Sequence, residues 1–357
     1  MMLGIFLASG ESFKEMTKSG QDIRFKKFYL KTFAKNFSRI YIFSFANEKV
    51  NGLPQNVTVI PNKYRIHKYL YGVLLPFINF SYIIKCDGFR AYHLFGTFPA
   101  IICRIIFGKP FIFNYAYNYQ EFAQIENKKF QKILLSIIEP IAILFSKRVF
   151  TATKSIFKNV GKKAVYLPNG VDTFFFRPTK NKKNRVKPII LSVGRLEKQK
   201  NYEVLINALR TVNAKLLVVG NGSLKNHLKS IAKNNGVELK IIENIENTKM
   251  PQVYNRADIF VLPSLAEGSS KVLLEAMSCG LPVIASKVKG PDEIIIDNVT
   301  GIFCSTNKRS IRNQVLKLIN TQSLRKKIGT EARKRIVEHF NLSKLILTET
   351  KAIQKII

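Results

Sequence analysis

Short runs of apolar residues alternate with amphipathic segments along almost the whole chain of 357 residues. Such runs have the length of buried strands, and the segments between them have the apolar spacing of helices that cover a sheet. This alternation is typical of βα units and a parallel sheet. It is interrupted once, by the polar and basic stretch FRPTKNKKNRVKP (Phe176–Pro188), which we interpret as a linker or exposed connection. The chain is therefore expected to form two doubly wound α/β domains.

The expected elements follow from the pattern. In the first half we expect strands at Leu3–Ala8, Ile40–Phe45, Ala91–Phe95, Phe111–Phe113, Arg148–Ala152 and Val165–Leu167, and helices at Asp22–Phe37, Ile66–Phe80, Phe98–Phe107 and Lys129–Phe145. In the second half we expect strands at Ile189–Val193, Lys215–Val219, Leu239–Ile242, Ile259–Leu262 and Pro282–Ala285, and helices at Tyr202–Leu209, Leu224–Asn234, Met250–Ala257, Lys271–Cys279, Lys308–Ile319 and Ser323–His339. The tail LSKLILTETKAIQKII is expected to be a last amphipathic helix.

These elements divide the chain into an N-terminal domain, residues 1–170, and a C-terminal domain, residues 171–340. The helix in residues 341–357 is expected to pack back on the N-terminal domain. A length of 357 residues also favours two domains of about 170 residues over one core. Ligands of open α/β sheets bind outside the carboxyl ends of the strands, so the functional residues are expected there.

The chain is strongly basic, with 58 Lys and Arg against 23 Asp and Glu, a formal net charge of +35. This excess favours an anionic partner such as nucleic acid, a membrane surface or a phosphorylated substrate, although a compositional bias towards Lys, Asn, Ile and Phe explains it as well. The most apolar windows, Tyr69–Ile84 and Ile133–Phe145, are shorter than the ~20 residues that span a bilayer, and each contains a proline. We therefore predict no transmembrane helix. The N-terminus MMLGIFLASGESF lacks a basic n-region and runs straight into the first expected strand, so we predict no signal peptide either.

The four cysteines are far apart in the sequence and form no CxxC pair: Cys86, Cys103, Cys279 and Cys304. A disulfide framework or a zinc site is therefore not expected, and a reducing cytosol is the better expectation.

The first group of candidate residues follows the strand Ile189–Val193. Gly194 allows a tight turn at the strand end, and Arg195 and Lys200 lie in the loop that follows. A guanidinium and an ammonium a few residues apart suit the oxygens of a diphosphate, but a solvated basic loop is the competing interpretation. The next strand ends in Gly220 and Gly222, a Gly-x-Gly that falls short of the dinucleotide fingerprint and is expected only to pack the strand against its helix.

The second group is a pair of glutamates in AEGSSKVLLEAMSCGLPVIAS. Glu267 lies in the loop after a buried strand, and Glu275 lies about a turn and a half inside the helix that follows. Ser269 or Ser270 can cap the start of this helix, whose free N–H groups attract an anion. A carboxylate accepts two hydroxyl protons at once, so both glutamates suit the hydroxyl-bearing ends of a nucleotide-sugar. The competing interpretation is a loop charge and a surface helix residue.

GRLEKQKN, LPNGVDTFFFRP and ADIFVLPSLAEGSSKVLLEAMSCGLPVIAS together resemble the family 4 glycosyltransferases, strongly over about residues 165–305 and only in outline before them. The resemblance implies a GT-B fold, in which two Rossmann-like doubly wound domains face each other across a cleft. It also implies sugar transfer with retention of configuration and without a metal, and the chain has no Asp-x-Asp motif.

The resemblance also assigns roles to residues. Arg195 and Lys200, after Gly194, would bind the donor diphosphate and stabilise it as a leaving group. Glu267 would hold hydroxyls of the transferred sugar, and Glu275 would bind the ribose. Backbone donors would come from Gly268, Ser269 and Ser270. The catalytic residues are accordingly expected to be Glu267, Arg195 and Lys200.

The N-terminal half departs from the family pattern in two places. Many members have a histidine after the strand that follows KP, where this chain offers Asn114, Tyr115 and Tyr117, so the donor sugar is left open. His93 is expected to pack at a strand end rather than serve the site. The glycine loop of the family is reduced to KSGQD, in which Ser19 and Gly20 are left as candidate donor-binding residues.

We therefore expect a retaining, metal-independent transferase that moves a sugar from a nucleotide-diphosphate sugar, with a UDP-sugar as the expected donor and no other cofactor. The expected acceptor is a glycan or a lipid-linked precursor of a cell-surface polysaccharide or lipopolysaccharide. Apolar, aromatic-rich segments in a cationic N-terminal half favour a cytoplasmic protein on the inner face of the membrane, in peripheral contact with anionic lipid. The competing interpretation is that these segments are core helices.

Two alternatives remain beside this expectation. A GT-B nucleotide-sugar epimerase would act without an acceptor. A nucleic-acid-binding protein would need interleaved aromatic and basic residues on one face or a helix-turn-helix, and neither pattern is present.

Overall fold

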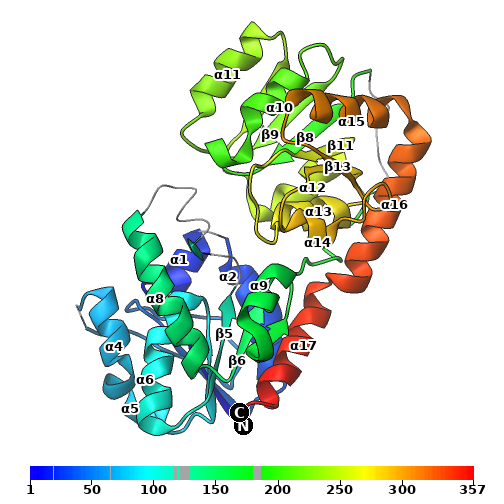
Figure 1. The fold of residues 1–357 in the computed structure, drawn as a ribbon. Coiled ribbons are helices and arrows are strands. Elements are labelled where there is room, and N and C mark those ends of the chain that lie inside the picture. The colour runs from blue at the N-terminus through cyan, green and yellow to red at the C-terminus, as the bar shows by residue number, and fades with distance from the viewer. Residues whose placement is uncertain (19, 65, 116–118, 121–128, 180–185) are drawn as a thin grey trace. The chain divides into compact units, whose positions relative to one another are not determined.

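The structure is a computed structural model that describes residues 1–18, 20–64, 66–115, 119–120, 129–179 and 186–357. The chain divides into two compact units, the first formed by residues 1–168 with 343–357 and the second by residues 169–342. Each unit is a parallel sheet covered by helices (Figure 1). In the described part of the chain, no helix is both long enough and apolar enough to cross a membrane.

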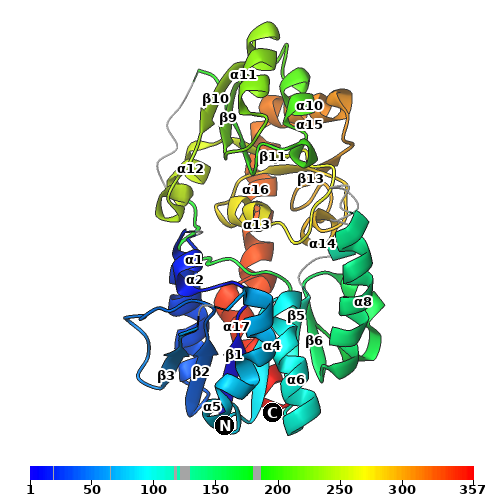
Figure 2. The ribbon, with the colours of Figure 1, turned by 90° about the vertical axis from the view of Figure 1, so that its left-hand side faces the viewer.

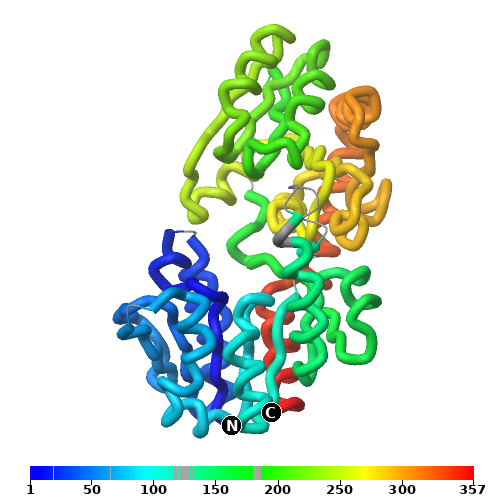
Figure 3. The backbone as a smooth tube through the Cα atoms, turned by 60° about the vertical axis from the view of Figure 1, so that its left-hand side comes forward, coloured from blue at the N-terminus to red at the C-terminus, as the bar shows by residue number. Residues whose placement is uncertain are grey.

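The first unit has seven parallel strands in the order β3-β2-β1-β4-β5-β6-β7. The strands are β1 (Met2–Phe6), β2 (Arg39–Phe43), β3 (Val57–Ile60), β4 (Gly88–Ala91), β5 (Phe111–Tyr115), β6 (Arg148–Thr151) and β7 (Ala164–Tyr166). The helices are α1 (Phe13–Lys18), α2 (Asp22–Arg24), a π-helical stretch (Phe25–Leu30), α3 (Lys31–Ala34), α4 (Lys68–Ile78), α5 (Phe80–Ile83), α6 (Thr97–Phe107), α8 (Lys129–Phe145), α9 (Lys154–Val160) and α17 (Leu342–Gln354). Both chain ends lie at the same end of this unit (Figure 3).

The second unit has six parallel strands in the order β10-β9-β8-β11-β12-β13. The strands are β8 (Ile189–Val193), β9 (Lys215–Val219), β10 (Glu238–Ile242), β11 (Ile259–Leu262), β12 (Val283–Ser286) and β13 (Ile302–Cys304). The helices are α10 (Tyr202–Ala208), α11 (Lys225–Asn234), α12 (Met250–Arg256), α13 (Lys271–Ser278), α14 (Pro291–Ile294), α15 (Lys308–Asn320) and α16 (Gln322–His339). The strand order turns back at β8, as in a dinucleotide-binding Rossmann sheet.

Strand β11 shows why these strands read as continuous apolar runs. Its four residues are all buried, but they alternate between two cores: Phe260 and Leu262 pack with α12, α13 and α16, whereas Ile259 and Val261 pack with α10, α11 and α15. A parallel strand covered by helices on both faces needs apolar side chains at every position. The prediction of two doubly wound α/β domains is thus confirmed.

The main local error concerns β4, which was expected at Ala91–Phe95 but runs from Gly88 to Ala91. The glycine and the arginine in this strand interrupt the apolar run by which strands were predicted. Gly88 is required because a Cβ there would lie 2.2 Å from the side chain of Ile357, and Arg90 is tolerated because it pairs with Glu349 of α17. The residues Leu94–Gly96 form a 3-10 turn instead.

The short elements β3, β13, α1, α5, α9 and α14 were not predicted, because three to seven residues give too little periodicity to detect. The stretch Phe176–Pro188 belongs to the second unit, where Phe176 is part of the core and the carbonyl of Arg177 accepts a hydrogen bond from Asn255. Residues 180–185 of that stretch lie outside the described residues.

Candidate active site

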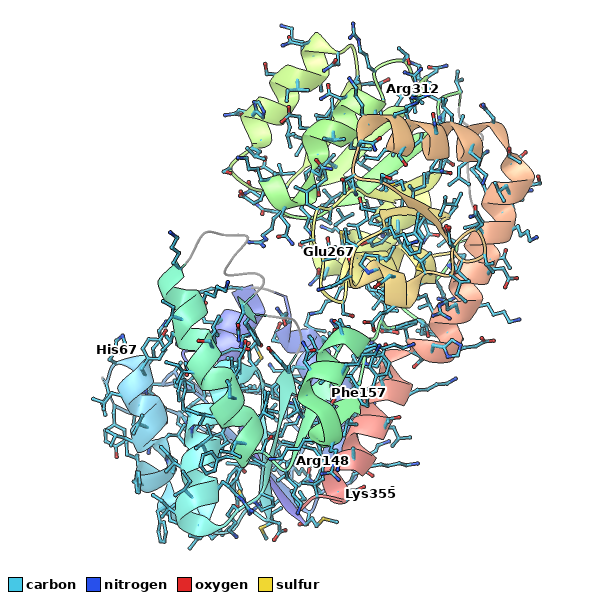
Figure 4. All side chains as sticks on the ribbon, viewed as in Figure 1. His67, Arg148, Phe157, Glu267, Arg312 and Lys355 are labelled. Carbon is cyan, nitrogen blue, oxygen red and sulfur yellow. The ribbon has the colours of Figure 1, made fainter. Side chains whose placement is uncertain are left out.

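The candidate residues of the second unit lie where its strand order reverses. Strands β8 and β11 are neighbours at the centre of the sheet, and their following segments lead to opposite sides: β8 to α10 and β9, β11 to α13 and β12. A crevice outside the carboxyl ends of the strands at such a switch point is the usual ligand site of a doubly wound sheet. The loop after β8 carries Arg195 and Lys200. The loop after β11 carries Glu267, which Figure 4 labels.

Lys200 and Glu267 form an ion pair between these two loops. Lys200 Nζ lies 2.5 Å from Glu267 Oε1, and the side chains are 14% and 8% exposed. The same carboxylate oxygen accepts a hydrogen bond from Ser264 Oγ at 2.6 Å. The sequence alone left Glu267 open as a solvated loop charge, but the structure holds it in one position, with its second oxygen, Oε2, outside both of these contacts.

Backbone and amide contacts fix the distance between the two loops. Gln199 Nε2 donates to the carbonyl of Ala266 at 2.8 Å, and Leu265 N donates to the carbonyl of Gln199 at 2.8 Å. Asn201, in the left-handed region at φ 55°, donates through Nδ2 to the carbonyl of Pro263 at 3.1 Å. Asparagine tolerates this backbone conformation better than most residues. The ion pair therefore lies on a preorganised frame.

The second candidate carboxylate, Glu275, accepts a hydrogen bond from a buried tyrosine. It lies in α13, is half-buried, and its Oε2 accepts a hydrogen bond from Tyr254 Oη of α12 at 2.8 Å. Burial, followed by the negative charge of Glu275, raises the pKa of Tyr254 well above its ordinary value, so the phenol stays protonated and keeps donating. Glu275 is therefore an oriented carboxylate, five residues into the helix, rather than a free surface charge.

The start of α13 differs from the expected serine cap. Ser270 occupies the N-cap position but its side chain makes no capping hydrogen bond. Its hydroxyl is buried and has no hydrogen-bond partner among the described residues, and Ser269 contributes its carbonyl to Asn169 Nδ2 at 3.1 Å. The expectation of a side-chain cap is thus wrong for Ser270. The N–H groups of the first turn, together with the Ser270 hydroxyl, remain donors for an anion.

Glycines bring the surrounding loops into close contact. A Cβ on Gly290, at φ 97°, would lie 1.9 Å from the carbonyl oxygen of Gly268. A Cβ on Gly194 would lie 3.1 Å from Lys200 Cε, so the bare strand end leaves room for the lysine stem. A Cβ on Gly220 would lie 1.9 Å from the carbonyl oxygen of Gly194, and one on Gly222 would lie 2.6 Å from the backbone of Leu196. Both glycines therefore pack against the loop after β8, whereas the sequence predicted packing of the strand against its helix.

The structure leaves Arg195 apart from the ion pair. Its side chain is exposed at the start of the loop, and among the interactions it makes is an electrostatic one with Glu197. Arg195 shares the loop with Lys200, but the contacts to Glu267 come from Lys200 and Ser264.

The remaining candidates lie in the first unit. Gly20 follows α1 at φ 67°, and its N–H donates to the carbonyl of Thr17 at 3.0 Å, whereas Ser19 and Tyr117 lie outside the described residues. Asn114 accepts a hydrogen bond from Arg90, and Tyr115 is buried beside Glu139. These two side chains therefore have structural partners where the family histidine would stand.

His93 lies just after β4, in the positive-φ region at 74°. Its ring stacks on Phe95 at 5.8 Å and meets Tyr119 edge-on at 4.8 Å, and burial lowers its pKa to about 4. The expectation that His93 packs at a strand end is confirmed.

Sequence reasoning missed Ser264, Tyr254 and Gly290. Ser264 stands three residues before Glu267, and Gly290 directly precedes Pro291, a pair that marks a turn, so both carry a weak local signal. Tyr254 carried none, because its role depends on α12 packing beside α13. In the described part of the chain, no group of three or more His, Cys, Asp or Glu is arranged to hold a metal ion.

Comparison with known sequences gives a match within the second unit. Residues 174–335 match the family model described as glycosyl transferases group 1. One curated relative is the UDP-Gal:alpha-D-GlcNAc-diphosphoundecaprenol alpha-1,3-galactosyltransferase of Escherichia coli, 27% identical over 197 residues, which are 50% of this chain and 51% of that one. The chain spans about half the length of the curated relatives that it matches.

Solved structures share the whole fold. A sucrose-phosphate synthase from Thermosynechococcus elongatus matches with a TM-score of 0.80 at 18% identity, over 99% of this chain and 98% of that one. The Anabaena protein HepE, solved in complex with UDP-glucose, matches with a TM-score of 0.73 at 16% identity, over 99% of both chains. The fold is GT-B, with two Rossmann-like domains, and the stretch that matches the glycosyl transferases group 1 model contains the Lys200–Glu267 pair and Glu275.

Proposed function

We propose that this chain is a retaining, metal-independent glycosyltransferase of family 4 that takes a hexose from a nucleotide-diphosphate sugar, with a UDP-sugar as donor. The observation that carries the proposal is the largely buried Lys200–Glu267 pair after β8 and β11, with the oriented carboxylate of Glu275 eight residues further along the chain, in α13. The family match of the second unit supports a glycosyltransferase, and the names of the two relatives above support a uridine-diphosphate donor.

Each group of the site has a task in this proposal. Glu275 accepts the ribose hydroxyls, and the N–H groups at the start of α13 with the Ser270 hydroxyl donate to the diphosphate. Lys200 and Arg195 stabilise the negative charge that collects on the diphosphate as it leaves. Glu267 keeps one carboxylate oxygen on Lys200 and Ser264, and its other oxygen accepts a hydroxyl of the transferred sugar.

The proposed transfer balances without another reactant. The bond between the sugar C1 and the diphosphate oxygen breaks, and its electron pair leaves with the diphosphate. The acceptor hydroxyl oxygen bonds to C1 on the same face, and its proton passes to the departing phosphate oxygen. A carboxylate at Glu267 stabilises the positive charge that develops on the sugar in this step.

The proposed acceptor is a glycan or a lipid-linked precursor in polysaccharide or lipopolysaccharide synthesis at the inner face of the cell membrane. The E. coli relative, whose name includes a diphosphoundecaprenol-linked sugar, supports a lipid-linked acceptor. The net charge of +35 supports peripheral contact with anionic lipid.

The experiment is a transfer assay with a panel of nucleotide-sugars and a membrane lipid extract as acceptor, run with and without EDTA. We expect sugar transfer from one donor class, unchanged by EDTA, with the anomeric configuration of the donor kept in the product. Loss of transfer in EDTA that added metal restores, or an inverted product, contradicts the proposed mechanism. Conversion of the donor alone into an epimer contradicts the transferase.

A further inference from the structure

Four helices of the first unit form a continuous layer on one face of its sheet. Helix α4 packs beside α5 and α6, and α6 packs beside α8 (Figure 1, Figure 2). On the opposite face lie α17 and the stretch around α3, where Gln354 Nε2 donates to the carbonyl of Asn36. We call the outer side of α4, α5, α6 and α8 the apolar face.

The apolar face is formed by large hydrophobic side chains that point away from the core. On α8, Ile133, Ile137 and Leu144 are 62%, 55% and 68% exposed, whereas Leu135 is buried. The other helices repeat this arrangement with exposed side chains at Leu70, Phe77, Phe80, Ile105 and Ile106. A surface helix normally has a polar outer side, so helices that are apolar on both sides require a second apolar environment.

The charges on this face have one sign. The sequences of α4, α5, α6 and α8 contain a single acidic residue, Glu139, which is 5% exposed and accepts a hydrogen bond from Gln120 Nε2 at 2.7 Å. The exposed charged residues of the four helices are Lys68, Arg104, Lys129 and Lys132. The surface is thus apolar with a cationic border.

One end of the apolar face contains a hollow of about 830 Å³ between α6 and α8. Its lining includes Arg104, Ile105, Leu144, Lys147, Arg148 and Lys163 (Figure 4 labels Arg148). Lys163 Nζ donates to the carbonyls of Ile143 and Leu144, and burial together with the charges of Arg104 and Arg148 lowers its pKa. The lining has four cations and no carboxylate, so an anion there would relieve their mutual repulsion.

We propose that the apolar face of α4, α5, α6 and α8 lies on an anionic lipid bilayer, with the phosphate of a lipid headgroup in the hollow between α6 and α8. Apolar side chains then enter the acyl boundary while the lysine and arginine heads stay at the level of the headgroups. Charge complementarity selects this occupant, because protein interfaces are depleted of lysine and the bilayer offers phosphate along the whole border. The proposal deepens the proposed peripheral location and rests on it.

The test is co-sedimentation of the purified full chain with vesicles of phosphatidylglycerol and phosphatidylcholine, and with vesicles of phosphatidylcholine alone. We expect binding to the mixed vesicles that high salt weakens. The variant Ile137→Gln/Leu144→Gln should bind at least ~10-fold more weakly, because two apolar side chains no longer leave water. The variant Lys147→Gln/Arg148→Gln should also bind the mixed vesicles more weakly at low salt. We expect a factor of about 5 in affinity for each charge removed, which corresponds to about 1 kcal/mol per charge.

The matched control is Leu347→Gln/Lys351→Gln on α17, at the other side of the same unit, where both positions are exposed. It should bind the mixed vesicles as the wild type does. Equal binding by the control and the α8 variant, or equal binding of the wild type to both kinds of vesicle, overturns the proposal. A lipid-free dimer that becomes a monomer on Ile137→Gln/Leu144→Gln also overturns it, in favour of a second copy on this face. Because no sugar is transferred, failure of the proposed catalytic function leaves this readout unaffected.

Discussion

At the scale of single residues, Lys200 has a structural task beside the catalytic one that we propose for it. Its ammonium holds Glu267 in a nearly buried position, and its stem lies over Gly194. A test of whether Lys200 binds the donor diphosphate must therefore measure turnover and folding separately. Loss of one partner of a largely buried ion pair leaves the other charge unpaired and destabilises the fold.

We expect Lys200→Met to lower kcat by about 10²–10³, because one preorganised cation at the leaving group is lost. The free energy of unfolding should fall by about 3–5 kcal/mol, since Glu267 loses its cation and keeps the hydrogen bond from Ser264. Steady-state kinetics and denaturant unfolding measure the two effects. Lys198→Met, an exposed lysine in the same turn, is the control and should change neither. Unchanged turnover in Lys200→Met would remove this residue from the chemistry.

The buried His93 predicts how the stability of the fold depends on pH. Burial lowers its pKa to about 4, against an ordinary value of about 6.5. Below pH 6.5 the unfolded chain binds a proton that the folded chain does not, so stability should fall as the pH drops from about 6.5 to about 4, by on the order of 3 kcal/mol. The non-titrating variant His93→Asn, which tolerates positive φ, should lack this part of the slope in urea unfolding measured at several pH values. Parallel pH profiles for both proteins would be the contrary result.

At the scale of elements, the contact between the loop after β11 and the segment before α14 depends on a glycine. Gly290→Ala should cost about 1–2 kcal/mol in backbone strain and about 1–3 kcal/mol more because its Cβ would meet the Gly268 carbonyl. Gly236→Ala has the same sign of φ, 66°, but open space around it, so only the strain should remain. Thermal unfolding of the two variants measures the difference, and equal destabilisation would mean that the loop contact is not tight.

How much the sequence predicts also differs between elements. Buried parallel strands such as β8, β9 and β11 were located to the residue, because each is a mostly apolar run that a glycine or a proline follows. Strand β4 was predicted at the wrong residues, because the partners of its glycine and its arginine, Ile357 and Glu349, lie more than 250 residues away in the sequence.

The same limit applies to the site. The positions of Glu267, Glu275 and Lys200 came from motifs along the chain. Three other features depend on packing between loops and helices, which a sequence pattern does not contain. They are the Lys200–Glu267 ion pair, the hydrogen bond from Tyr254 to Glu275, and the missing side-chain cap at Ser270.

At the scale of the whole molecule, the chain ends complete the first unit. Arg90 and Glu349 are 0% and 2% exposed and form an ion pair, while Arg90 Nη2 donates to Asn114 Oδ1 at 2.8 Å. Residues 343–357 are thus part of the unit that begins at Met1. The fold of the first unit depends on the last helix of the chain.

We expect Glu349→Ala to lower the free energy of unfolding by about 3–5 kcal/mol, because it leaves Arg90 buried and charged without its carboxylate. The double variant Arg90→Met/Glu349→Leu should lose less than the single one, since it buries no unpaired charge. Urea unfolding of the three proteins measures both changes. A single variant as stable as the wild type would show that Arg90 does not need the pair.

The central claim is that Glu275 and the start of α13 bind the nucleotide diphosphate of a sugar donor. The most direct measurement is the unfolding free energy of the wild type and of Glu275→Gln with sugars of uridine, guanosine and adenosine diphosphate. One donor, expected to be a UDP-sugar, should stabilise the wild type by about 2.7 kcal/mol at 100 times its Kd. At the same concentration Glu275→Gln should retain well under half of this, because hydrogen bonds to a charged group are worth about 1.5–3 kcal/mol each. Stabilisation of the wild type by none of the donors, or equal stabilisation of Glu275→Gln, would contradict the account.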